Sequence, residues 1–265
     1  MNEQEYNEID AIRATQLKAL ATGGDLALWA ATYGEKSATP AMRFGRLCHA
    51  LALLPEEEVK AQFVVAPFAD FRTKEAREWK AAQIEKGTDI CTEAEIDDAY
   101  KVAIRFTEAA AWREGAFNFT LLKDTEVSAV AEIVGGVKIK ARADLLSADR
   151  SVLFDLKTTS SVTEAENQFW RLRYDIQAGL YALAIPSVRE AKFIFVETSS
   201  PFRSAVVALK GEDLEEAKRT AQAYAVRAAD LLSRNGNDRD AYSSEVANVE
   251  THRPLWVVDR FLDGV

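Results

Sequence analysis

Hydrophobic and polar residues alternate along residues 126–159, and this alternation predicts three β-strands. Residues 126–134 form the first strand, and Gly135 and Gly136 supply a two-residue hairpin turn. In the second strand the apolar residues are Val137, Ile139, Ala141, Ala143 and Leu145. The third strand places Val152, Phe154 and Leu156 on one face. Period-two alternation is typical of strands in a sheet, and residues 147–151 form a polar turn between the second and third strands.

Helical spacing marks most of the remaining chain. It predicts helices over residues 1–35 with a break at Gly23 and Gly24, and over residues 40–54, 73–86, 92–114, 163–185 and 213–234. Thr92 and Glu95 have the spacing of a capping box. We expect residues 73–86 and 92–114 to form a solvated helical hairpin. Two further strands are expected at residues 191–198 and 203–209, and residues 63–71 are expected to be extended.

The order of these elements predicts an α/β fold. Helices come first, then three strands, a helix, two strands and a long helix, which is typical of a mixed central β-sheet flanked by helices. We expect residues 1–265 to form a single domain, with a mainly helical portion at 1–118 and the α/β portion at 119–265. Residues 254–258 are expected to form a final strand or a docking tail.

Composition narrows the class of protein. An apolar fraction of 48% with 28% charged residues is ordinary for a globular protein. The two cysteines, Cys48 and Cys91, are too few for a disulfide framework or a four-cysteine metal site. The net charge of −9 argues against indiscriminate coating of nucleic acid and is mild evidence against a DNA partner.

The chain contains no apolar run long enough to span a membrane. Its first ten residues are acidic and lack the apolar region of a signal peptide. We therefore expect a cytoplasmic protein with no membrane partner.

Two strands carry residues suited to metal chemistry. Asp155 and Lys157 point to the same face of their strand, and Asp144 can approach them from the preceding strand. Carboxylates bind Mg²⁺ or Mn²⁺, and a neighbouring lysine can orient or deprotonate the attacking water or stabilise negative charge. The arrangement suits metal-dependent phosphodiester hydrolysis. An exposed Asp–Lys pair on a strand is the structural alternative, because an Asp-x-Lys sequence alone is common.

Two other features have both a structural and a functional interpretation. His49 lies on the helix at residues 40–54, four residues after Gly45, which leaves room beside the imidazole. Taken alone, a histidine at the edge of a core is its commoner interpretation. Tyr174, Gln177 and Tyr181 share one helical face, separate from the apolar stripe formed by Phe169, Leu172, Ile176, Leu180 and Leu183. This face is either a half-exposed rim or part of a site.

Taken together, these motifs resemble the PD-(D/E)xK nuclease superfamily, and more narrowly the RecE-type exodeoxyribonuclease VIII group of phages and prophages. The resemblance is carried by Asp144, by the run from Asp155 to Thr159, and by Gln177 and Tyr181. The helix at residues 12–20, the G-R-x-x-H-A-L-x-L-x-P run at residues 45–55 and the segment 72–74 also fit, in the same order. It covers most of the chain to about residue 202. Ala143 stands where the family pattern has proline.

The resemblance implies roles for individual residues within a restriction-endonuclease-like core. His49, Asp144, Asp155 and the carbonyl of Leu156 would bind Mg²⁺, with Mn²⁺ as a substitute. Lys157 would be the catalytic lysine. Gln177 and Tyr181 would hold the substrate strand or its scissile phosphate.

Further candidates are less specific. Glu126 is our preferred carboxylate on the strand before Asp144, with Glu132 as its rival. For DNA contacts the leading candidates are Arg46, Arg142, Thr158 and Tyr174. The wider set of basic candidates is Arg13, Arg43, Arg46, Lys138, Lys140, Arg142, Arg171 and Arg173.

The activity implied is Mg²⁺-dependent exonuclease digestion of linear double-stranded DNA, 5′ to 3′, leaving 3′ single-stranded tails for phage-type recombination. Such a protein would bind double-stranded DNA ends, form a ring-shaped homo-oligomer and work with a single-strand annealing protein. The alternatives are another PD-(D/E)xK nuclease, either an endonuclease or a single-strand exonuclease, and a catalytically silent DNA-end-binding module.

Overall fold

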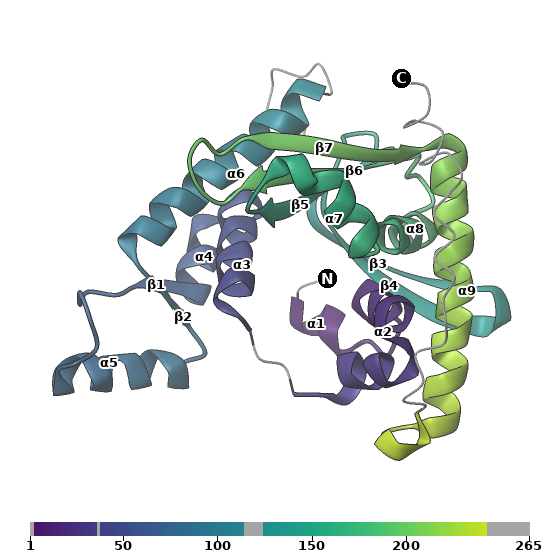
Figure 1. Cartoon of the computed structure of the whole chain (residues 1–265), viewed down its shortest axis with the longest axis horizontal. Helices are drawn as coiled ribbons and strands as arrows, with labels where there is room; N and C mark the ends of the chain where they lie inside the picture. Colours follow the sequence, from purple (N-terminus) through teal and green to yellow (C-terminus); the bar gives the residue numbers. More distant parts are fainter. Residues whose placement is uncertain (1–2, 36–37, 114–123, 243–265) are drawn as a thin grey trace.

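A mixed five-stranded sheet lies at the centre of the molecule (Figure 1). A computed structural model describes residues 3–35, 38–113 and 124–242 of the chain. The sheet has the order β3-β4-β5-β6-β7, and its parallel pair is β5 with β6. The strands are β3 (Asp124–Ile133), β4 (Val137–Leu146), β5 (Val152–Thr159), β6 (Glu190–Glu197) and β7 (Ser204–Lys210). The predicted α/β fold with a mixed sheet is confirmed.

The turn between β3 and β4 shows why the two glycines are there. Gly135 and Gly136 have φ values of +79° and +72°, the left-handed region that residues with a Cβ rarely adopt. The strands on either side pair in antiparallel register, with Ile133 opposite Val137. The predicted hairpin is confirmed, but its turn has three residues, Val134–Gly136, and not the predicted two.

β4 and β5 pair over only a short stretch next to their turn. The register contains Leu145 opposite Phe154 and Leu146 opposite Leu153, and the two strands then separate. Beyond this point β4 pairs instead with the N-terminal segment. The Ile12 N–H donates to the Lys138 carbonyl at 2.9 Å, and the Lys140 N–H donates to the Ile12 carbonyl at 2.8 Å. The separation leaves a gap in the sheet beside Asp144.

Helices cover both faces of the sheet. One face packs against α2 (Ala14–Tyr33), α8 (Tyr174–Ala184) and α9 (Gly211–Asn235), with Phe193 and Phe195 of β6 fully buried there. The other face packs against α3 (Pro40–Leu53) and α6 (Glu93–Arg113), with Phe154 and Ile194 buried. Figure 1 shows α9 and α6 on opposite sides of the molecule. Since neighbouring residues of a strand point to opposite faces, β5 and β6 contribute to both apolar clusters.

The N-terminal region is less continuously helical than the sequence predicts. α1 (Glu3–Glu8) ends before Ile12 because the chain must become extended there to pair with β4. The predicted break at the glycine pair appears as a kink within α2, where Gly24 has a φ of +71°. α3 begins as expected, with the Thr39 hydroxyl accepting a hydrogen bond from the Met42 N–H at 3.2 Å.

The predicted helix over residues 163–185 is wrong in its continuity. The structure has two helices, α7 (Ala165–Arg171) and α8, because Arg173 between them adopts a left-handed conformation with a φ of +53°. The Arg173 guanidinium pairs with the Asp175 carboxylate in the first turn of α8. Leu172 consequently leaves the predicted apolar stripe and is 42% exposed.

The predicted solvated helical hairpin is also wrong. α5 (Lys74–Glu85) begins at the Thr73 cap and stands away from the sheet, with Ala76 as its buried residue (Figure 1). α6 instead packs Val102 and Phe106 into the core. β1 (Phe63–Val65) lies within the segment predicted to be extended. Its short parallel sheet with β2 (Asp89–Cys91), and the helix α4 (Glu56–Gln62) before it, were not predicted, because three-residue strands show too little alternation.

Other helix predictions are confirmed. The capping box of α6 has the expected reciprocal bonds between Thr92 and Glu95, at 2.8 Å and 3.1 Å. In the described residues every helix is too short or too polar to cross a membrane. The predicted final strand or tail at residues 254–258 lies outside the described residues.

Candidate active site

The gap between β4 and β5 is bridged by a side chain. Where the backbone ladder ends, Asp144 Oδ2 accepts a hydrogen bond from the Leu156 N–H at 2.8 Å. His49 Nδ1 of α3 lies 3.3 Å from the same oxygen. The imidazole and the carboxylate are therefore brought together from separate elements, as the sequence predicts.

Asp155 and Lys157 of β5 lie next to this pair. Lys157 Nζ forms an ion pair with Asp155 Oδ1, and Gln177 Nε2 of α8 donates to Asp155 Oδ2 at 2.6 Å. Asp155 is 1% exposed and Gln177 5% exposed. Burial alone would lower the pKa of Lys157, but the charges of Asp155, Tyr174 and Asp144 outweigh it and raise this pKa. The lysine thus remains an ammonium at neutral pH.

Tyr174 and Tyr181 line the α8 side of the site. Lys157 Nζ lies 4.6 Å from the centroid of the Tyr174 ring, which stacks on Phe193 with centroids 5.5 Å apart. Tyr181 is half-buried. Burial first, and then the nearby carboxylates of Asp155 and Asp144, raise its pKa well above the ordinary value. Tyr181 therefore stays a neutral hydroxyl.

The structure adds Lys18 of α2, which the sequence analysis did not identify. Its Nζ donates to Gln177 Oε1 at 2.9 Å and lies 4.6 Å from the centroid of the Tyr174 ring. Burial and the charge of Lys157 lower the pKa of Lys18 to about 7. No sequence signal distinguishes this lysine from a surface lysine of an amphipathic helix, because its partners lie at the other end of the chain.

Of the two alternative glutamates, Glu126 is the one that lies beside Asp144. It falls between the β3–β4 pairs Thr125–Leu145 and Val127–Ala143, and it has a φ of +51°. Its carboxylate forms an ion pair with the side chain of Arg142. Glu132 pairs with Lys138 near the far hairpin and is exposed.

The donors around the gap fit a divalent cation. Among the described residues no three His, Cys, Asp or Glu side chains form a ready-made metal cluster. However, the buried Asp155 Oδ1 has the Lys157 ion pair but no well-directed hydrogen bond. Burial, followed by the charges of Asp155 and Glu126, raises the pKa of Asp144 well above its ordinary value. A cation held by His49, Asp144, Asp155 and the Leu156 carbonyl would offset this excess negative charge.

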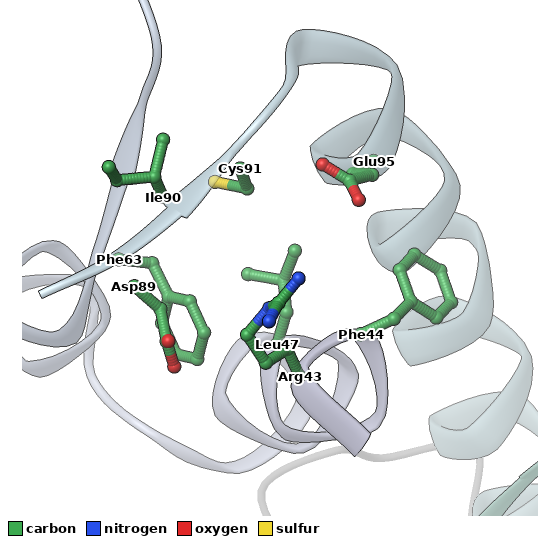
Figure 2. Close-up of a pocket in the computed structure, with 8 residues that line it drawn as sticks. All are labelled: Arg43, Phe44, Leu47, Phe63, Asp89, Ile90, Cys91 and Glu95. Atoms are coloured by element: carbon green, nitrogen blue, oxygen red, sulfur yellow. The ribbon is translucent and has the colours of Figure 1, made fainter. Parts of the chain in front are cut away.

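Two of the predicted DNA-contact residues have other partners in the structure. Arg46 pairs with Asp89 of β2 at 2.7 Å and is largely exposed. Asp89 also lines a small cavity between α3, β2 and α6, whose floor includes Phe44, Leu47 and Phe63 (Figure 2). This cavity contains none of the carboxylates of the gap. Arg142 is held by Glu126, and its Nη1 atom is buried without a hydrogen-bond partner.

Thr158 lies against α3. A Cβ placed on Gly45 would stand 3.4 Å from the Thr158 hydroxyl oxygen. This is close to an ordinary van der Waals distance, so α3 and β5 lie near each other at Gly45 and Thr158.

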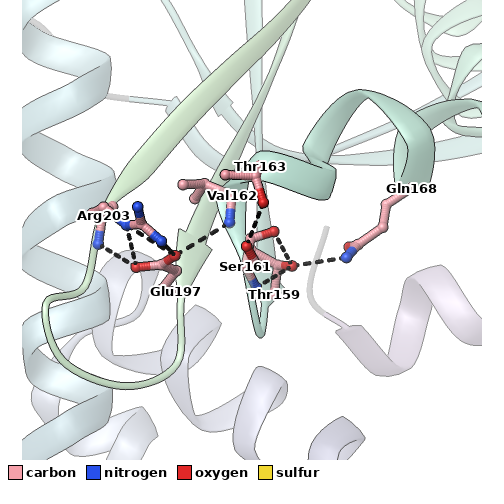
Figure 3. Close-up of polar contacts among 7 residues, drawn as sticks. All are labelled: Thr159, Ser161, Val162, Thr163, Gln168, Glu197 and Arg203. Atoms are coloured by element: carbon pink, nitrogen blue, oxygen red, sulfur yellow. Dashed lines mark hydrogen bonds and ion pairs between the residues drawn. The ribbon is translucent and has the colours of Figure 1, made fainter.

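The loop after β5 is fastened on both sides (Figure 3). The Thr159 hydroxyl accepts a hydrogen bond from Gln168 Nε2 at 2.9 Å. Glu197 accepts one from the Val162 N–H at 3.3 Å and pairs with Arg203 at 2.6 Å. The hydrogen bond from Arg203 lowers the pKa of Glu197 to about 2. These contacts hold the end of β5, and with it Lys157, against β6 and α7.

The fold and the acid–lysine site define a chain of the PD-(D/E)xK class. The model of the family described as PDDEXK-like domain of unknown function (DUF3799) matches residues 14–237. The chain belongs to this family, which confirms the superfamily that the sequence motifs resemble. A search of curated proteins gave no match.

Comparison with solved structures shows a similar fold. A putative exonuclease from Eubacterium rectale is 14% identical, with a TM-score of 0.58 over 88% of this chain and 84% of that one. A phage-related exonuclease from Haemophilus somnus is 15% identical, covering 71% of this chain and 94% of that one with a TM-score of 0.34. An alkaline exonuclease from Laribacter hongkongensis is 17% identical, covering 68% and 97% with a TM-score of 0.31. At these identities the likeness concerns the fold alone, and the first structure carries it.

Proposed function

We propose that this protein is a Mg²⁺-dependent exodeoxyribonuclease that degrades linear double-stranded DNA from 5′ to 3′. The observation that carries the proposal is the convergence of Asp144, Asp155, Lys157 and Gln177 at the gap between β4 and β5. Buried carboxylates beside an ammonium group suit phosphodiester hydrolysis, which requires a metal ion and stabilisation of developing negative charge. Mn²⁺ would substitute for Mg²⁺.

Each residue has a separate proposed role. His49, Asp144, Asp155 and the Leu156 carbonyl would hold the metal ion, and Glu126 would support it or a second ion. When bound, the ion would polarise a phosphoryl oxygen and lower the pKa of water.

Lys157 would stabilise the negative charge that develops on the phosphate. Its alternative role is to orient or deprotonate the attacking water. Gln177 and Tyr181 would hold the substrate strand or its scissile phosphate. Arg46, Arg142, Thr158 and Tyr174 remain our candidates for contacts to DNA.

The proposed substrate, products and partner protein are supported by the resemblance to RecE-type exonucleases. The RecE-type motif order favours an exonuclease that acts on double-stranded DNA ends, leaves 3′ tails and cooperates with a single-strand annealing protein. A solved structure of the same fold is described as a putative exonuclease. From the same resemblance we propose a ring-shaped homo-oligomer of phage or prophage origin, working in the bacterial cytoplasm, in which residues 1–265 act as one nuclease domain.

The test is digestion of 5′-phosphorylated linear duplex DNA in Mg²⁺, with closed-circular duplex and single-stranded DNA alongside. Strands labelled at the 5′ or 3′ end report the polarity. The wild type should degrade the linear duplex alone, and Asp155→Ala and Lys157→Ala should be inactive. Full activity in either variant would reject the assignment.

The other outcomes identify the alternatives. Cleavage of the closed circle would indicate an endonuclease, and digestion of single strands alone would indicate a single-strand exonuclease. Binding to linear ends without digestion in Mg²⁺ or Mn²⁺ would indicate a catalytically silent end-binding module.

A further inference from the structure

Lys18 lies in the site but is not part of the motif. It reaches the site from α2, and its two contacts there are the hydrogen bond to Gln177 Oε1 at 2.9 Å and the Tyr174 ring. Among the described residues, no carboxylate lies within ion-pair distance of its ammonium group. Lys18 is partly buried, and a partly buried ammonium group without a carboxylate partner loses hydration, so its position calls for an explanation.

The chemistry of the neighbours fixes the direction of the Gln177 side chain. The Asp155 carboxylate can only accept hydrogen bonds, so an amide beside it points its NH₂ group at Asp155. The amide oxygen is then directed at Lys18, whose amino group donates to it. The observed distances, 2.9 Å and 2.6 Å, agree with this direction.

The same chain of contacts fixes Asp155. With Oδ2 taken by the Gln177 amide, Oδ1 is the oxygen left on the side of Lys157, where it has no well-directed hydrogen bond. If Lys18 were removed, Asp155 would still favour the NH₂ end of the amide, but Gln177 would lose the hydrogen bond that holds its oxygen. The side chain would then be free to move away from Asp155.

We propose that Lys18 is a positioning residue, which acts through Gln177 to hold the Asp155 carboxylate in the orientation that binds the metal ion. The inference rests on the proposed function, since it assigns Asp155 to the metal. It predicts that metal affinity depends on a residue that touches neither the ion nor the carboxylate. Partners of this outer kind typically change metal affinity by about 10- to 100-fold.

The experiment measures Mn²⁺ binding to the DNA-free protein by calorimetry in five forms: wild type, Lys18→Met, Lys18→Arg, Gln177→Met and the double variant Lys18→Met/Gln177→Met. Lys18→Met should weaken binding about tenfold. Lys18→Arg should restore most of the affinity, because a guanidinium can donate the same hydrogen bond. The double variant should bind no more weakly than Gln177→Met alone, because Lys18 acts through that residue.

Lys192→Met is the matched control, since it removes another largely buried lysine without touching the gap. It should bind Mn²⁺ like the wild type. Thermal unfolding of each metal-free variant checks the fold. A purely structural role for Lys18 would lower the melting temperature of Lys18→Met without the affinity pattern.

Several results would overturn the inference. These are unchanged Mn²⁺ affinity in Lys18→Met, losses that multiply in the double variant, or a wild type that binds no Mn²⁺. A different result would show that the proposed nuclease function is wrong. If the wild type binds Mn²⁺ but digests no DNA, the nuclease assignment falls while the affinity pattern still decides the role of Lys18.

Discussion

The strands β5 and β6 run side by side in parallel, and each carries an acidic residue followed two positions later by a lysine. On β5 the pair is Asp155 and Lys157, and on β6 it is Glu190 and Lys192. In both pairs the two side chains contact each other, with 3.5 Å between Lys192 Nζ and Glu190 Oε2. By sequence alone, both match an acid-x-Lys pattern.

Their surroundings differ. The β5 pair faces α2 and α8, where Gln177 contacts Asp155 and where the gap beside β4 brings Asp144 close. The β6 pair lies toward the start of its strand on the opposite face, where Lys192 Nζ stands 5.5 Å from the centroid of the Phe154 ring.

An acid-x-Lys pair forms a site only where the residues packed around it complete the site. Asp144, the Gln177 amide and the interrupted β4–β5 ladder surround the pair on β5. The described neighbours of the pair on β6 include the Phe154 ring. Substitutions in the two pairs should therefore differ in their effect on DNA digestion.

The largest difference is expected between the two lysines. Lys157→Met should lower the rate of digestion of linear duplex by about 10²- to 10³-fold, because it removes the charge placed for the transition state. Lys192→Met should keep a rate near that of the wild type. Initial rates of nucleotide release at saturating Mg²⁺ measure both. Equal losses in the two variants would remove the distinction between the pairs.

A smaller effect is expected at His49. His49→Ala should raise the metal concentration needed for half-maximal activity about tenfold, because it removes one proposed ligand beside Asp144. A titration with Mg²⁺ and with Mn²⁺ measures this concentration, and circular dichroism checks that the variant is folded. A normal metal titration would make His49 a structural residue.

The smallest effect concerns stability and not chemistry. Glu197, another acid of β6, has a pKa lowered to about 2 by its hydrogen bonds with Arg203. A carboxyl whose folded pKa is lowered stabilises the protein above the unfolded pKa, and that contribution disappears as the pH falls. The free energy of unfolding should therefore decrease between pH 4.5 and about 2 more steeply in the wild type than in Glu197→Gln.

Urea unfolding at several acidic pH values measures this slope. At neutral pH, Glu197→Gln should retain DNA digestion, because the residue fastens the loop and has no part at the gap. Parallel pH profiles for the two proteins would contradict the assignment of the Arg203 contact.

Much of the fold could be predicted because its signals are local. The alternation in β4, the glycine turn before it and the cap at Thr92 each depend on residues close together in the sequence. The position of His49, Asp144, Asp155 and Gln177 around one gap also agrees with the motif order, because the motif fixes which elements carry them.

The features that the sequence did not predict depend on contacts between segments that are distant along the chain. β4 stops pairing with β5 where Ile12 pairs with β4 instead. No local sequence pattern predicts this pairing of the N-terminal segment with β4. Lys18 is recognised only through its bond to Gln177. The break at Arg173 and the burial of α6 likewise follow from tertiary packing that overrides the helical periodicity.

Mn²⁺ binding to the DNA-free protein shows whether the pair on β5, and not the pair on β6, belongs to a metal site at the β4–β5 gap. Calorimetry on the wild type, Asp155→Asn and Glu190→Gln compares the two carboxylates, because each substitution removes one negative charge. We predict that Asp155→Asn weakens Mn²⁺ binding at least tenfold, whereas Glu190→Gln binds like the wild type. Wild-type affinity in Asp155→Asn, or an equal loss in Glu190→Gln, would contradict the account.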